Sequence, residues 1–158
     1  MTTQAIPEVT AFLRLLRVNA TIRRELDARL LRAHGLTVKD YEVLVSLARA
    51  EGGLARRVDL AERVLLTPSG ITRLLDGLER LGLVEKGHCP SDARVTYAVI
   101  TEAGREAAAA AQGEHDKLLR ELIGGSLAPA ELETLIELLG RLPGADTSAC
   151  ALDPGRED

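Results

Sequence analysis

The sequence predicts a mainly α-helical fold with one small β-hairpin, and three observations lead to this prediction. Apolar residues recur along most of the chain at the spacing of amphipathic helices. Glycines, prolines and capping residues divide this pattern into six helical segments. The stretch LVEKGHCPSDARVTYAVIT, residues 83–101, instead has β-like runs at 83–87 and 95–100 around a polar tip. Because a two-stranded hairpin is marginal in water by itself, we expect it to pack on the helices.

Capping signals order the helices. The first is expected from Glu8 to Ala33, with Gly35 as its stop. The second is expected to begin after Thr37, an N-cap residue with Asp40 three positions on. The others are expected at about 58–65, from Thr67-Pro68 to Gly82, from Thr101 to Gly124-Gly125, and from Pro129.

Two helices joined by a tight turn and followed by a hairpin constitute a winged helix-turn-helix. The second helix of this pair has an apolar stripe that we expect to be buried, and polar residues occupy its other face. The stripe consists of Ile71, Leu74, Leu75, Leu78 and Leu81.

Composition limits the classes of function. The net charge is −4 and by itself disfavours nucleic-acid binding. Residues 1–95 nevertheless hold fifteen Lys and Arg against twelve Asp and Glu, whereas residues 96–158 hold five against twelve. A basic face therefore remains available in the first two-thirds of the chain. Only three aromatic residues are present, too few for a surface that binds nucleic acid by base stacking.

The sequence indicates neither a membrane protein nor an enzyme. No apolar run approaches the roughly 18 residues of a membrane span, and no signal peptide is evident, so a cytoplasmic protein is expected. Cys89 and Cys150 make no disulfide framework. The three histidines are scattered, so no metal site is predicted. No phosphate-binding loop or catalytic motif is recognisable, and neither catalysis nor a cofactor is expected.

The run from residue 35 to residue 106 resembles the MarR family of bacterial transcription factors, and the likeness extends over roughly residues 8–140. Its sharpest parts are PSGITRLLDGLERLGLVEK, the Asp92-x-Arg94 pair, and ITEAG after the hairpin. The resemblance implies a homodimer that binds duplex DNA, with a recognition helix in the major groove and the wing in the minor groove. It also implies dimerisation by the first and last helices.

The resemblance divides the chain into an N-terminal dimerisation helix (1–35), a winged helix-turn-helix domain (36–100), C-terminal dimerisation helices (101–142) and a tail (143–158) expected to be disordered. It assigns DNA contact in the recognition helix to Pro68, Ser69, Thr72 and Arg73, and in the wing to Asp92 and Arg94. Phosphate contacts are expected from Arg56, Arg57 and Lys86. An arginine at a helix N-terminus can reach a base edge, and a narrow minor groove attracts an inserted arginine.

Alternatives stay open at several of these residues. Arg73 could pair with Asp76 or Glu79 on its own helix, and Arg94 could form only a local ion pair with Asp92. Three departures from the family pattern are Ala93, where a second arginine is common, Leu65, where the turn commonly has glycine, and His88-Cys89 in the wing. Cys89 beside His88 is a low-ranking redox candidate; the alternative is an exposed spectator thiol.

Two functions are therefore considered. The first is a sequence-specific regulator, most often a repressor in this family, that binds a near-palindromic operator and is released by a small ligand. Arg14 and Arg17 would suit an anionic effector in a cleft between the dimerisation helices and the winged domain. The second is a winged helix that binds protein rather than DNA, which would show no salt-dependent DNA affinity.

Overall fold

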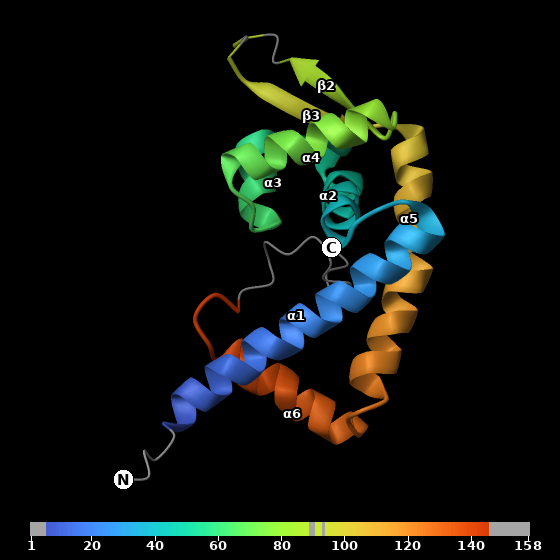
Figure 1. Cartoon of the computed structure of the whole chain (residues 1–158). Helices are drawn as coiled ribbons and strands as arrows, with labels where there is room; N and C mark the ends of the chain where they lie inside the picture. Colours follow the sequence, from blue (N-terminus) through green and yellow to red (C-terminus); the bar gives the residue numbers. More distant parts are fainter. Residues whose placement is uncertain (1–5, 89–90, 93, 146–158) are drawn as a thin grey trace.

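The computed structural model describes residues 6–88, 91–92 and 94–145. These residues form a compact winged domain on top of a frame of three long helices (Figure 1). The frame consists of α1 (Pro7–His34), α5 (Glu102–Leu119) with a π-helical extension (Arg120–Gly124), and α6 (Pro129–Gly140). The winged domain consists of α2 (Val38–Arg49), a short 3-10 turn (Glu51–Gly53), β1 (Leu54–Arg56), α3 (Arg57–Arg63), α4 (Pro68–Arg80), β2 (Val84–His88) and β3 (Thr96–Ile100).

The predicted helix boundaries are confirmed within one or two residues for most elements, because the local capping signals operate as expected. Thr37 accepts a hydrogen bond from the Asp40 backbone N–H, and the Asp40 carboxylate accepts one from the Thr37 N–H, at 3.1 and 2.8 Å. Gly35 ends α1 with a φ of 68°, a left-handed conformation that glycine adopts without strain. Gly82 has the same conformation after α4, with a φ of 71°.

The hairpin is the larger part of a three-stranded antiparallel sheet with the order β1-β3-β2. In register, Val84 lies opposite Ile100 and His88 opposite Thr96. Strand β1, which pairs Leu54 with Val99, was not predicted from the sequence. It is only three residues long and follows the Gly52-Gly53 break, so its sequence shows no strand periodicity. The expectation that the hairpin packs on other elements is confirmed, because the sheet contacts α2, α3 and α4.

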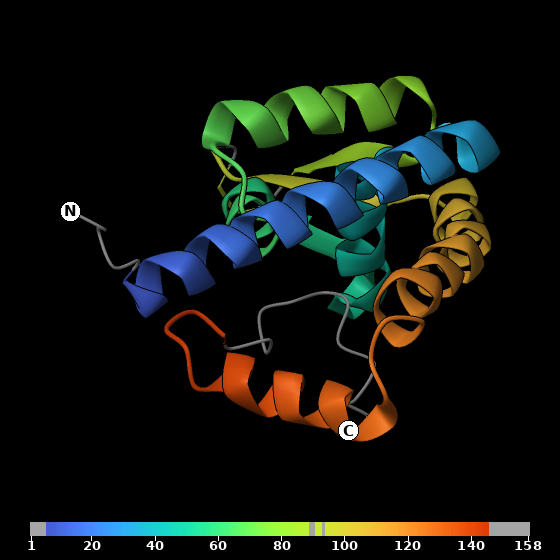
Figure 2. The ribbon, with the colours of Figure 1, turned by 60° about the horizontal axis from the view of Figure 1, so that its bottom comes forward.

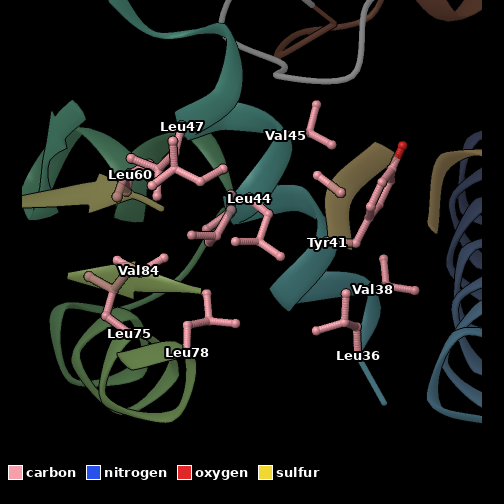
Figure 3. Packing of buried hydrophobic residues seen from close by; sticks show 14 of the residues in the cluster. Leu36, Val38, Tyr41, Leu44, Val45, Leu47, Leu60, Leu75, Leu78 and Val84 are labelled. Atoms are coloured by element: carbon pink, nitrogen blue, oxygen red, sulfur yellow. The ribbon is translucent and has the colours of Figure 1, made fainter. Parts of the chain in front are cut away.

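The core lies where α2, α3 and α4 meet the sheet, and it continues between α2, α1 and α5. It is built from aliphatic residues, with Tyr41 as its one aromatic side chain among the described residues (Figure 3). From α4, Leu75 and Leu78 point into it and are 1% exposed. The predicted apolar stripe is partly wrong: Leu74 is only half-buried and Leu81 is 61% exposed. Leu81 is the C-cap residue, at the point where the chain leaves the helix toward β2.

Two backbone positions, Leu65 and Gly104, are restricted by their geometry. Leu65, in the turn between α3 and α4, has a φ of 53° and is 88% exposed. A left-handed conformation is costly for leucine, which explains why this turn commonly uses glycine. Gly104 lies at the start of α5, where an added Cβ would meet the Leu83 carbonyl oxygen at 2.1 Å. The glycine of the ITEAG motif therefore permits the close approach of α5 to the chain entering β2.

The frame leaves much apolar surface uncovered. Of the apolar residues along α1, Leu26 and Leu30 are buried, whereas Phe12, Leu15 and Leu16 are exposed. Leucines and isoleucine on α6 are exposed as well. Between the two helices runs a groove of about 1170 Å³ with a mostly apolar lining. None of the described helices is long and apolar enough to cross a membrane.

Candidate nucleic-acid interface

The N-terminus of α4 is exposed and presents polar groups outward. The Thr67 side chain caps it by accepting a hydrogen bond from the Gly70 N–H at 3.1 Å, and Pro68 fills the first helical position. Ser69 Oγ lies 3.3 Å from Thr67 Oγ1. Free N–H groups and hydroxyls at a helix N-terminus favour contact with a phosphate oxygen. Thr67 was predicted only as a cap, yet it also contacts Ser69.

Thr72 and Arg73 lie one turn further along α4. The Thr72 hydroxyl donates to the Pro68 carbonyl at 2.9 Å, which leaves its methyl group and both oxygen lone pairs available. Arg73 is exposed, and within the described part of the chain its guanidinium makes no hydrogen bond or ion pair. The alternative in which Arg73 pairs with Asp76 or Glu79 is therefore not what the structure shows. An uncommitted guanidinium on this face has all five donors available.

The wing tip carries the second arginine. The Arg94 side chain is 93% exposed, and its Nε lies 3.4 Å from Asp92 Oδ1. The same Asp92 oxygen accepts a hydrogen bond from the Arg94 backbone N–H at 2.9 Å, and the Asp92 carbonyl accepts one from the Val95 N–H at 3.1 Å. Asp92 thus shapes the turn, and its carboxylate forms with Arg94 the local ion pair that was considered for these two residues. Figure 1 shows the hairpin extending beyond α4, on the side of the molecule away from α6.

The three predicted phosphate contacts differ in their surroundings. Arg56, at the N-cap of α3, pairs with Asp59 through an Nε to Oδ2 distance of 3.0 Å. The next residue, Arg57, is half-buried and has no ion pair among the described residues. Lys86 on β2 pairs with Glu79 and Asp76 of α4. The structure thus brings the sites on α3, α4 and the sheet into one domain, but two of the three cations are already paired.

Other predicted features lie elsewhere. Cys89 and Ala93 fall outside the described residues, as does the tail from residue 146 onward. His88 is exposed on β2, whereas His115 is buried on α5, with its ring centroid 4.7 Å from that of Tyr41. No cluster of three or more metal-ligating side chains occurs in the described ranges. What the sequence did not indicate is the pairing of Lys86 with both acids of α4, although their i, i+3 spacing on one helix was visible.

The chain is similar to transcriptional regulators of the MarR family and of the HTH type. The model of the MarR family matches residues 34–95. The HTH-type transcriptional regulator MhqR of Bacillus subtilis is 31% identical over 109 residues, which cover 69% of this chain and 73% of that protein. The uncharacterized HTH-type transcriptional regulator YdgJ of the same organism is 28% identical over 68% of this chain, and the match spans only 64% of its own length.

Solved structures are similar over most of the chain. AbsC, a MarR family transcriptional regulator from Streptomyces coelicolor, is 32% identical, with a TM-score of 0.76 over 88% of this chain and 93% of that one. Sco3205 from the same organism, in complex with DNA, is 25% identical with a TM-score of 0.78 over 88% of each chain. A mutant MarR from Escherichia coli, complexed with operator DNA, is 27% identical with a TM-score of 0.73 over 87% of this chain and 96% of that one.

Proposed function

Because this chain belongs to the MarR family of winged-helix transcriptional regulators, we propose that it is a homodimeric repressor that binds duplex DNA sequence-specifically. The observation that carries the proposal is the uncommitted Arg73 near the exposed N-terminus of α4, combined with the nearly fully exposed Arg94 on the projecting wing. Two of the similar structures are complexes with DNA. The relatives are transcriptional regulators and not enzymes.

The proposed reading places α4 in the major groove and the wing in the neighbouring minor groove. Ser69 and Thr72 contact phosphates or bases near the start of α4, and Arg73 reaches a base edge. Arg94 enters the minor groove, while Asp92 holds the wing turn. A good bidentate arginine contact gives about 1–3 kcal/mol of discrimination between bases. Arg57 is the phosphate contact that we favour on α3, because Arg56 is paired with Asp59.

A second copy of the chain is the proposed occupant of the exposed apolar surface of α1 and α6. Phe12 is 59% exposed, Leu16 is 50% exposed and Ile136 is 63% exposed, which is unusual for large apolar side chains grouped on two neighbouring helices. The groove between α1 and α6 has the mostly apolar lining that a partner helix requires. This supports the domain division with dimerisation in 1–35 and 101–142, and DNA binding in 36–100. In a two-fold dimer the half-sites lie about one helical turn apart.

Release by a small anionic ligand is the remaining part of the proposal. Among the described residues that line the groove between α1 and α6, Arg14 has the one charged side chain. The expected effector cleft, between the dimerisation helices and the winged domain, is a different location, so the two sites must be distinguished by experiment. A panel of small carboxylates that raises the thermal midpoint of the wild type, but not of Arg14→Gln, would place the anion at Arg14.

The decisive experiment is the selection of bound duplexes from a random pool, followed by affinity for the selected operator as a function of salt. We expect a near-palindrome and a steep loss of affinity with salt. Replacement of the wing arginine, Arg94→Ala, should cost about 1–3 kcal/mol of binding with the fold intact. Arg24→Ala is the matched control, because Arg24 is a 74% exposed arginine on α1. If no sequence is enriched, and the wild type and Arg94→Ala bind random duplex DNA with equal affinity, the protein-binding winged helix is favoured instead.

A further inference from the structure

Lys86 is directed toward α4 and not away from the protein. Its Nζ lies 3.2 Å from Glu79 Oε2 and 3.9 Å from Asp76 Oδ1. Lys86 shares a face of β2 with Val84, since side chains alternate along a strand, and Val84 is buried against the inner side of α4 (Figure 3). The strand that holds Lys86 therefore packs on the helix that holds both acids.

Asp76 and Glu79 lie on the same exposed face of α4 as Arg73. Asp76 follows Arg73 by three residues, so both lie on neighbouring turns of the same helix face. Glu79 follows Asp76 by another three, and Arg73, Asp76, Glu79 and Arg80 together line one shallow surface depression. The Asp76 side chain is 50% exposed and that of Glu79 is 23% exposed. Two uncompensated carboxylates here would repel the phosphates that the helix has to approach.

Lys86 is well placed to compensate for them. An ammonium group has three donors and interacts as a compact point charge, so one lysine can serve two carboxylates at once. The side chain is 47% exposed, and an ion pair of this exposure adds little to folding stability. Its effect on an approaching polyanion is different, because it changes the charge of the surface that the polyanion meets.

We propose that Lys86 is a positioning residue that neutralises Asp76 and Glu79, and that it does not itself contact a DNA phosphate. The inference rests on the proposed DNA-binding function and replaces the phosphate contact that the sequence suggested for Lys86. The carboxylates thereby stay on the recognition helix without repelling DNA. The guanidinium of Arg73, one turn before Asp76, stays available for DNA because Lys86 forms the ion pairs with Asp76 and Glu79.

The test compares four proteins on the operator selected with the wild type: the wild type, K86M, the triple variant K86M/D76N/E79Q, and K86R. We expect K86M to bind about tenfold more weakly, because two uncompensated carboxylates in each protomer then face the phosphates. The triple variant should return to within about threefold of the wild-type affinity, and its salt slope should return to the wild-type value. K86R should bind like the wild type, because it restores the charge.

Two results would overturn the inference. If Lys86 contacts a phosphate, the triple variant stays as weak as K86M, and its salt slope is shallower by about 0.9 for each lost contact. If K86M binds like the wild type, the carboxylates do not matter. Urea denaturation checks that each variant is folded, and K86Q replaces K86M if the latter is not. Failure of the wild type to select any operator would refute the proposed function and the inference with it, whereas the two results above refute the inference alone.

Discussion

Replacing Leu78 by alanine should lower the free energy of unfolding far more than the same replacement at Leu81, although both leucines belong to one apolar stripe. Leu78 is 1% exposed and lies in the core beneath α4 (Figure 3), whereas Leu81 is 61% exposed at the C-cap. The sequence pattern alone treats the two positions alike. The structure separates them.

The magnitude follows from the atoms removed. Leucine to alanine deletes three carbon atoms, and burial of each is worth about 0.8 kcal/mol, which gives about 2.4 kcal/mol of lost transfer free energy at Leu78. The cavity left behind adds to this, so the total falls in the range of about 2–5 kcal/mol known for buried leucines. At Leu81 only the smaller, buried part of the side chain contributes, so a loss of about 1 kcal/mol or less is expected.

Equilibrium urea denaturation, followed by far-ultraviolet circular dichroism, measures both losses. Protein concentration has to be identical in all samples, because dimerisation contributes to the free energy of unfolding. Leu81→Ala should also retain wild-type affinity for the operator. Equal losses at the two positions would refute the assignment of inner and outer faces of α4, and with it the placement of Arg73 on the outer face.

Two further predictions concern the backbone and the pH. Leu65→Gly should raise the free energy of unfolding by up to about 1 kcal/mol, because glycine adopts the φ of 53° without strain. The greater conformational entropy of glycine in the unfolded state offsets part of this gain. Leu65→Ala, measured in the same urea titration, should give no such gain. Burial, and next the Asp116 carboxylate, raise the pKa of Tyr41 to about 12 from its usual 10. The native state then holds this proton more tightly than the unfolded state, so the contribution of Tyr41 to the free energy of unfolding is fully present below pH 10. As the pH rises toward 12, about 2–3 kcal/mol of it is lost. Between pH 9 and pH 12 the free energy of unfolding should therefore fall by that much more in the wild type than in Tyr41→Phe, and parallel pH profiles of the two proteins would contradict the raised pKa.

The helices could be predicted because their signals are local. Caps such as Thr37 with Asp40, and stops such as Gly35 and Gly82, act within four residues of the positions they control. The strand β1 escaped prediction because three residues show no periodicity, and it exists only through its pairing with β3. The exposure of Leu81 escaped for a related reason: helical spacing assigns a residue to a face but does not say where the neighbouring elements stop covering that face.

The site shows the same division between local and tertiary information. The arginine at the wing tip and the polar N-terminus of α4 were predicted from motifs, since each lies within a short stretch of sequence. The role of Lys86 was not, because its partners Asp76 and Glu79 lie on another element, and their approach depends on how β2 packs against α4. A lysine on a wing strand is easily taken for a phosphate contact when its intramolecular partners are unknown.

The acidic net charge of the chain is compatible with DNA binding because the charge is unevenly placed. The stretch 54–96 holds seven Lys and Arg against six Asp and Glu, so the proposed DNA-facing surface is close to neutral rather than acidic. Within it, Asp59, Asp76, Glu79 and Asp92 each lie within 4.0 Å of a cation, whereas Arg57, Arg63, Arg73 and Arg80 have no ion pair among the described residues. Helix α6, by contrast, carries three glutamates and no Lys or Arg, and it lies at the opposite edge of the molecule from α4 (Figure 2). The Debye length is about 10 Å at 0.1 M salt, and exposed charges that are further apart than this are largely screened. The glutamates of α6 therefore repel a phosphate at α4 only weakly. What governs affinity is therefore the local compensation of the acids on α3, α4 and the wing, which is the property that the Lys86 variants would change.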